Sequence, residues 1–176
     1  MTVRDMILSM ALIVLPILAV IWLMPRTAPS SPVAAVSASE YQAMLSAARS
    51  NLPFTALSPT DLPAAWQLTS DEYQPEGQTA ADWHLGYVTA SGKYAVFEQS
   101  TESIAEFLNA ESSNATVSGT VEMAGESWQE YTGSSPSALK TLLFRQSIVK
   151  GMNTIEVVAG SAPMSELRTL ADSLQG

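Results

Sequence analysis

Cysteine is absent from this chain, and histidine occurs once, as His84. Without cysteine there is no disulfide, no thiolate nucleophile and no cysteine-based zinc site. A hydrolase built on His84 would also need a nucleophilic serine and an acid. The sequence contains no G-x-S-x-G motif, the tight turn that exposes such a serine in many hydrolases. Phosphate-cradling glycine loops, HExxH and dinucleotide fingerprints are missing as well. We therefore predict that the protein is not an enzyme and has no catalytic residues, cofactor or metal site.

Basic residues are also scarce. The 176 residues include 8 Lys or Arg and 17 Asp or Glu, for a net charge of −9. After residue 26 the balance is 6 basic against 16 acidic residues. A surface of this sign repels nucleic acid and anionic lipid headgroups. We expect no nucleic-acid partner and favour partners that are neutral or cationic.

The longest apolar segment is MILSMALIVLPILAVIWLM, residues 6–24, which holds no charged residue. As a helix it would cover about 28 Å, close to the hydrocarbon thickness of a bilayer. A cleaved signal peptide is the alternative, but its apolar stretch is usually about 7–15 residues long and ends near the cleavage site. The small-residue candidate here, Val36-Ser37-Ala38, lies well beyond the apolar run. A buried soluble helix is the third possibility, and the Pro/Ser/Ala-rich segment that follows argues against it. We predict an uncleaved membrane anchor.

The basic residues that flank this segment suggest its orientation. Arg4 and the amino terminus precede it, Arg26 follows it closely, and the next basic residue is Arg49. This is a small bias towards a cytoplasmic N-terminus. The predicted organisation is a cytoplasmic stub (1–5), a single transmembrane helix (6–24) in the lipid bilayer of the cell membrane, a spacer (25–37) and an extracytoplasmic domain (38–176).

The remainder of the chain has the pattern of an α+β domain. Ser37 and Glu40 form an S-x-x-E capping box, which predicts a helix to about Arg49. Because most of the strands that follow are joined by short turns, a mostly antiparallel sheet of about six or seven strands is expected, with one face covered by helices. Strands are predicted over residues 66–73, 83–89, 93–100, 117–123, 128–132, 139–146 and 154–159, and further helices over 103–110 and 163–174.

A weak internal similarity links two parts of this domain. Trp66, a turn at Gly92 and a helix at Glu106 recur as Trp128, a turn at Gly151 and a helix near Glu166. The spacing suggests two β-β-β-α halves, with chance similarity as the alternative.

His84 lies in a predicted strand, where alternate residues point to opposite faces. We interpret it as a residue of the sheet face rather than a general base, because a base needs a nucleophile and an orienting group. Sensing of pH is a further alternative for His84.

Most of the aromatic residues should lie in the core or in cross-strand pairs. Aromatic residues that are exposed beside polar ones would form a binding patch for sugars, peptides or protein partners. The candidate residues for such a patch are Trp83, His84, Tyr94, Glu98 and Gln99.

Three weaker signals have ordinary explanations. Ser137 and Lys140 make a formal S-x-x-K, but its S-D-N and K-T-G partners are absent. Asp71, Glu72 and Glu76 offer oxygen ligands to a cation such as calcium, yet they lack the spacing of a calcium loop. We interpret the first as chance and the second as solvated surface charge. Asn114 fits a glycosylation acceptor pattern, which we interpret as a coincidence.

Several short motifs together resemble a known family. They are Arg4-Asp5-Met6, Leu62-Pro63 with Trp66, Trp83-His84-x-Gly86-Tyr87-Val88, Gly92-Lys93-Tyr94 and Glu98-Gln99-Ser100. In this order they resemble the actinobacterial membrane proteins grouped as domain of unknown function 4245. The chain departs from that pattern at Ala65, where the family tends to have glycine, and at Ala90-Ser91, where it tends to have Pro-Asp. The resemblance implies a single-pass envelope protein of an actinobacterium and carries no catalytic residues across.

The sequence thus favours a membrane-anchored binding or assembly module of the cell envelope, which recognises an unknown envelope protein or cell-wall component. The alternatives are an envelope hydrolase with a Ser/His/acid site and a structural subunit of a membrane complex.

Overall fold

The structure is a computed structural model, and it describes residues 34–77, 79–111, 115–132 and 141–176. Within these residues seven strands form one antiparallel sheet in the order β2-β3-β4-β8-β7-β6-β5. The predicted α+β class and the antiparallel sheet are confirmed, and each predicted strand has its counterpart. The strands are β2 (Gln67–Gln74), β3 (Asp82–Val88), β4 (Tyr94–Ser100), β5 (Thr116–Met123), β6 (Glu126–Thr132), β7 (Thr141–Val149) and β8 (Met152–Gly160).

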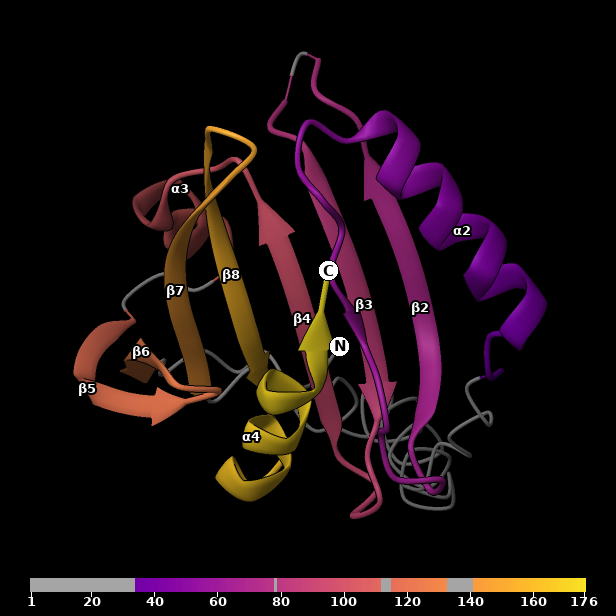
Figure 1. Cartoon of the computed structure of the whole chain (residues 1–176). Coiled ribbons are helices and arrows are strands. Elements are labelled where there is room, and N and C mark those ends of the chain that lie inside the picture. Colours follow the sequence, from indigo (N-terminus) through magenta and orange to yellow (C-terminus); the bar gives the residue numbers. More distant parts are fainter. Residues whose placement is uncertain (1–33, 78, 112–114, 133–140) are drawn as a thin grey trace, which may run out of the picture. The chain divides into compact units, whose positions relative to one another are not determined.

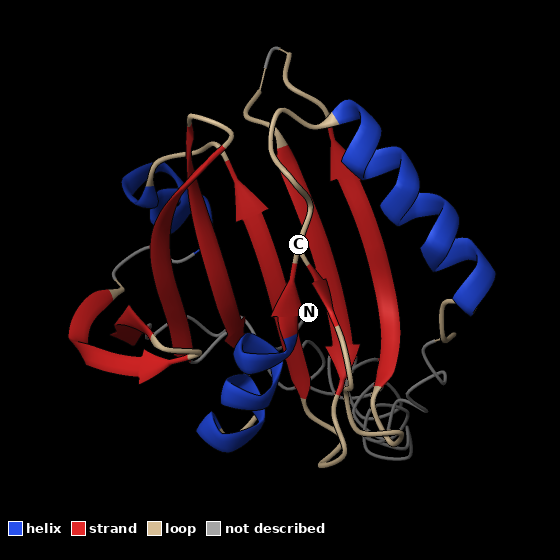
Figure 2. Cartoon of the chain, in the orientation of Figure 1, coloured by secondary structure: helices blue, strands red, loops and turns tan. Residues whose placement is uncertain are grey.

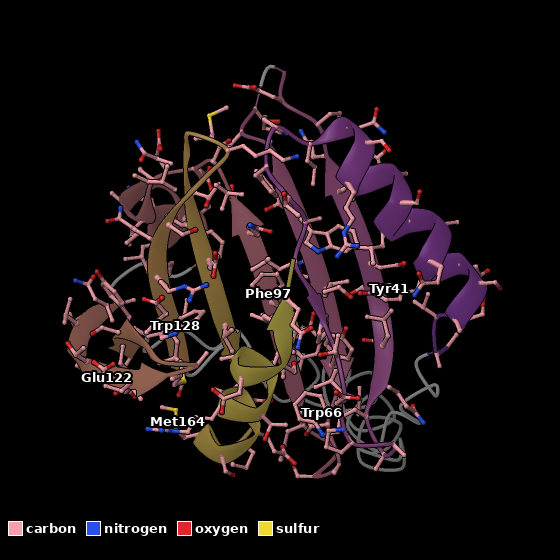
Figure 3. The ribbon with its side chains drawn as sticks, viewed as in Figure 1. Tyr41, Trp66, Phe97, Glu122, Trp128 and Met164 are labelled. Carbon is pink, nitrogen blue, oxygen red and sulfur yellow. The ribbon has the colours of Figure 1, made fainter. Side chains whose placement is uncertain are left out.

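Helices lie on both faces of the sheet (Figure 1). Helices α2 (Ala38–Asn51) and α4 (Met164–Ser173) pack on one face, which we call the covered face, against side chains that include Trp83 and Phe97. Figure 3 looks onto this face, where the labelled Phe97 and Trp128 lie. Helix α3 (Ile104–Glu111) packs on the other side of the sheet.

We call this second side of the sheet the open face. There Phe107 of α3 packs edge-on against Phe144, with ring centroids 5.4 Å apart. The prediction that helices cover one face is therefore wrong for α3. Its apolar residues are too few to reveal from the sequence which face they meet.

Local sequence signals explain where several elements begin and turn. The capping box is confirmed, because the Ser37 side chain accepts from the Glu40 backbone N–H and the Glu40 carboxylate accepts from the Ser37 N–H. Lys150 and Gly151 join β7 to β8 with φ values of 53° and 79°. Two consecutive residues with positive φ make the tight hairpin turn that matches the strand twist, and glycine adopts that φ without a steric penalty.

A second, two-stranded sheet was not anticipated. It pairs β1 (Ser58–Pro59) with β9 (Leu174–Gln175) and so joins the segment after α2 to the end of the chain (Figure 2). Strands of two residues are too short to show an alternating pattern, so this pairing is decided by tertiary contacts.

The predicted β-β-β-α repeat holds only for the strands. The sheet order places β2-β3-β4 beside β8-β7-β6, with β4 and β8 paired antiparallel. If the two halves were true repeats, the twofold axis that relates β4 to β8 would run perpendicular to the sheet. Such an axis leaves each face of the sheet in place, so the helices of both halves would pack on the same face. Because α3 and α4 pack on opposite faces, the repeat is wrong for the helices.

The anchor predicted for residues 6–24, with the stub before it and most of the spacer after it, lies outside the described residues. In the part of the chain that is described, no helix has the length and apolar character needed to cross a membrane.

Candidate functional site

A pocket of about 470 Å³ lies on the open face, over β2, β3 and β4 and beside α3. We call it the open-face pocket. Polar groups come from all three strands, and apolar side chains of β4, β8 and α3 complete it. Its lining residues are Ser70, Glu72, Tyr73, Gln74, Asp82, His84, Tyr94, Val96, Glu98, Phe107 and Ala159.

Strand register explains why these polar side chains meet. Glu72 of β2 pairs with His84 of β3, and His84 pairs with Glu98 of β4. Directly paired residues on neighbouring strands point to the same face, so the three form a row across the sheet. His84 Nδ1 lies 3.6 Å from Glu98 Oε2, and both side chains are partly exposed.

Asp82 has the largest pKa shift among the residues that line the pocket. Burial, followed by the charge of Glu98 and a hydrogen bond to its carboxyl group, raises the pKa of Asp82 from 3.8 to about 8. Within the described ranges, the Oδ1 atom of Asp82 is buried and has no hydrogen-bond partner. Among the described residues that line the pocket, none is Lys or Arg. The pocket thus holds a proton at neutral pH and lacks a permanent positive charge.

The raised pKa of Asp82 makes stability depend on pH. Between its ordinary pKa of 3.8 and about 8, the folded chain keeps a proton that the unfolded chain has released. Stability should therefore fall as the pH rises through this window and level off above it. Asp82→Asn keeps the neutral form at every pH. We expect its stability to match the parent near pH 4 and to exceed it by on the order of 2–4 kcal/mol at pH 8.

Urea unfolding of the full chain at several pH values measures this difference. Glu126→Gln, at an exposed position on β6, is the matched control for losing one negative charge. Equal pH slopes for Asp82→Asn and the parent would show that Asp82 does not hold the proton.

Tyr94 and Ser70 meet above Gly86 of β3. The Tyr94 hydroxyl bonds to the Ser70 side chain, while burial raises the Tyr94 pKa. A Cβ at position 86 would overlap both the Ser70 Oγ and the Tyr94 hydroxyl oxygen. Glycine at position 86 therefore leaves room for the Tyr94 side chain, which lines the pocket.

The structure separates the five residues predicted as a binding patch. His84, Tyr94 and Glu98 line the open-face pocket, whereas Trp83 and Gln99 are 0% exposed on the covered face. The prediction of one surface is wrong for these two. Trp83 pairs with Gln99 and His84 pairs with Glu98, so strand alternation sends the two pairs to opposite faces.

Trp83 and Gln99 have a structural role instead. The Trp83 indole N–H donates to the Leu57 carbonyl oxygen at 2.8 Å, and the Gln99 Oε1 accepts from the Leu57 N–H at 3.2 Å. Together they hold the segment between α2 and β2 against the sheet.

The sequence prediction missed four important pocket residues: Ser70, Glu72, Asp82 and Phe107. Strand periodicity places Asp82 on the same face as His84, so this signal was available. Glu72 and Ser70 depend on the register between β2 and β3, and Phe107 on the packing of α3. No pattern in the sequence specifies those contacts.

The acidic residues considered as cation ligands do not come together. Asp71 pairs with Leu85 on the covered face, so Asp71 and Glu72 point to opposite sides of β2. Across the described ranges no group of three His, Asp or Glu side chains is arranged to hold a metal ion. Ser137, Lys140 and Asn114 lie outside the described residues.

Comparison with known proteins gives one match. The family described as "Protein of unknown function (DUF4245)" matches residues 1–174. No curated protein and no solved structure matches the chain.

Proposed function

The chain belongs to the family of proteins of unknown function DUF4245, matched over residues 1–174, and on that premise we propose that it is a binding module with its ligand site in the open-face pocket. A concave site with a few convergent polar groups is the usual form of a ligand site. The observation that carries the proposal is Asp82, a pocket carboxyl group whose Oδ1 is buried and has no hydrogen-bond partner among the residues that the structure describes. Buried polar atoms are nearly always hydrogen-bonded, so a ligand donor would complete the site.

The cellular setting is part of the same proposal. Residues 6–24 anchor the chain in the cell membrane with the N-terminus in the cytoplasm, and residues 25–37 space the domain from the bilayer. The apolar length of the anchor and the small basic bias before it support this placement. The ligand is then an envelope protein or a cell-wall component, and the protein works as a binding or assembly module of the envelope.

A hydrolase is the second candidate, because Ser70, His84 and three carboxyl groups line the same pocket. Two observations weigh against it. The Ser70 hydroxyl bonds to Tyr94, and no hydrogen bond joins Ser70 to His84 in the described part of the chain. A nucleophilic serine needs its base within hydrogen-bond reach.

Site-specific photocrosslinking of the full chain in its own membrane tests the binding module. A photoreactive side chain replaces Gln74, which is exposed at the pocket, and in a matched control replaces Val117, which is 61% exposed on β5. We expect a discrete adduct from position 74 that is absent from position 117 and is lost with Glu98→Gln. The same adduct from both positions, or one unaffected by Glu98→Gln, would exclude the pocket as the ligand site.

Ser70→Ala separates the two candidates. A hydrolase would lose turnover of the captured molecule, and its adduct would contain a cleaved fragment. A binding module would yield an intact molecule in the adduct from position 74, both with and without Ser70→Ala. Membrane fractionation of the same cells tests the anchor, because the full-length chain should sediment with the membranes.

A further inference from the structure

Three carboxyl groups converge on the open-face pocket from three adjacent strands. Glu72 comes from β2, Asp82 from β3 and Glu98 from β4. The side chains of Asp82 and Glu98 are mostly shielded from solvent, while Glu72 lies exposed at the rim. The pocket therefore has an exposed carboxyl group, Glu72, at its rim and a mostly shielded pair, Asp82 and Glu98, farther in.

The spacing of these groups disfavours a metal ion as the ligand. A calcium ion needs six to eight oxygen ligands within about 2.6 Å. In the residues that the structure describes, no three acidic or histidine side chains approach closely enough for that. An organic cation needs no full shell of carboxylate oxygens, because its N–H donors can also bond to neutral oxygen acceptors.

Apolar side chains stand directly beside the carboxyl groups. Val96 and Phe107 are 4% and 3% exposed, Ala159 is 0% exposed, and all three line the pocket. The Tyr94 ring, on the same strand as Glu98, adds an aromatic surface of the kind that attracts cations. A ligand that fills the pocket therefore meets acceptors on one side and hydrocarbon on the other.

We propose that the open-face pocket binds a primary ammonium group carried on a short apolar stem. This inference rests on the proposed binding function and specifies its ligand class. An ammonium group is a compact charge whose N–H donors can use the Asp82 and Glu98 carboxyl groups together with other pocket acceptors, whereas a guanidinium fork pairs best with a single carboxylate. Asp82 and Glu98 accept from the ammonium group, and the stem packs on Val96 and Phe107.

Binding of the ammonium group should release a proton. Among the described residues, the titratable side chains that line the pocket with Asp82 are Glu72, Tyr73, His84, Tyr94 and Glu98, and the charge of Glu102 also acts on Asp82. Asp82 is neutral at pH 7 because its pKa is raised to about 8. A neighbouring cation favours the carboxylate, so the Asp82 proton passes to the buffer as the ligand enters. Affinity should then rise between pH 6 and pH 8, where the amine itself stays charged.

Calorimetric titration of the full chain in mild detergent tests the inference. The probe is Nα-acetyl-lysine methylamide, and its neutral counterpart is Nα-acetyl-norleucine methylamide. We expect the lysine probe to bind at least about tenfold more tightly than the norleucine probe. Titrations in buffers of different ionisation enthalpy should show release of up to about one proton per ligand at pH 7.

Variants identify the source of the proton. Asp82→Asn should abolish the release and weaken binding, Glu98→Gln should weaken binding, and Glu126→Gln outside the pocket should do neither. Equal binding of the two probes, binding without proton release, or an unchanged Asp82→Asn variant would each overturn the inference.

Free diamines and lysine side chains carry the same group, so cadaverine forms a second arm of the titration. Tighter binding of cadaverine indicates a small diamine as the ligand, and tighter binding of the capped lysine indicates a side chain of a partner. If none of these probes binds while the adduct at position 74 still depends on Glu98, the ammonium ligand is excluded and the binding function stands.

Discussion

Trp83→Ala is expected to lower the free energy of unfolding by about 4 kcal/mol, which is within the range for truncating a buried aromatic residue. The side chain is 0% exposed in the core between the sheet, α2 and α4. Its indole N–H also donates to the Leu57 carbonyl oxygen at 2.8 Å. The variant therefore leaves a cavity and a carbonyl group without its donor.

Urea unfolding of the full chain, followed by circular dichroism, measures this loss. Trp83→Phe keeps most of the packing and removes the donor, so it should cost only about 1–2 kcal/mol. Trp66→Ala is the matched control, since Trp66 is partly exposed and packs beside Tyr87 with ring centroids 6.1 Å apart. A Trp66→Ala loss as large as that of Trp83→Ala would show that Trp83 has no special place in the core.

Arg145→Met is expected to cost about 3–5 kcal/mol, because it leaves a buried carboxylate without its cation. Glu156 is 1% exposed, and its Oε2 accepts from the Arg145 Nε at 2.9 Å. The Arg145 guanidinium also lies 5.0 Å from the centroid of the Trp128 ring. Without Arg145, the Ser147 hydroxyl at 2.8 Å remains as a donor to the other carboxylate oxygen.

A double-mutant cycle tests whether the uncompensated charge causes this loss. The double variant Arg145→Met with Glu156→Leu removes both charges, and we expect it to recover most of the stability. If the double variant is as unstable as Arg145→Met alone, then lost packing on Trp128 accounts for the effect.

Strand and helix positions were accessible from the sequence because their signals are local. The capping box at Ser37 and Glu40, the turn glycines at positions 92 and 151 and the two-residue alternation of β3 each depend on a few neighbouring residues. The two-residue strands β1 and β9 carry no such signal, so their pairing was missed.

The candidate site was only partly accessible for the same reason. Alternation along β3 and β4 correctly groups His84 with Glu98, and it would have placed Asp82 with them and Trp83 and Gln99 on the other face. The contribution of Glu72 depends on the register of β2, and that of Phe107 on which face α3 covers.

The sequence alone determined the acidic balance, which depends only on composition. It also determined the apolar segment at residues 6–24 and the succession of strands and helices, because these follow from patterns among neighbouring residues. Tertiary structure decided which carboxyl groups share a pocket, which face each helix covers and why Trp83 is buried. Those outcomes depend on strand register and side-chain packing between segments far apart in the chain, and the balance of these contacts exists only once the sheet has formed.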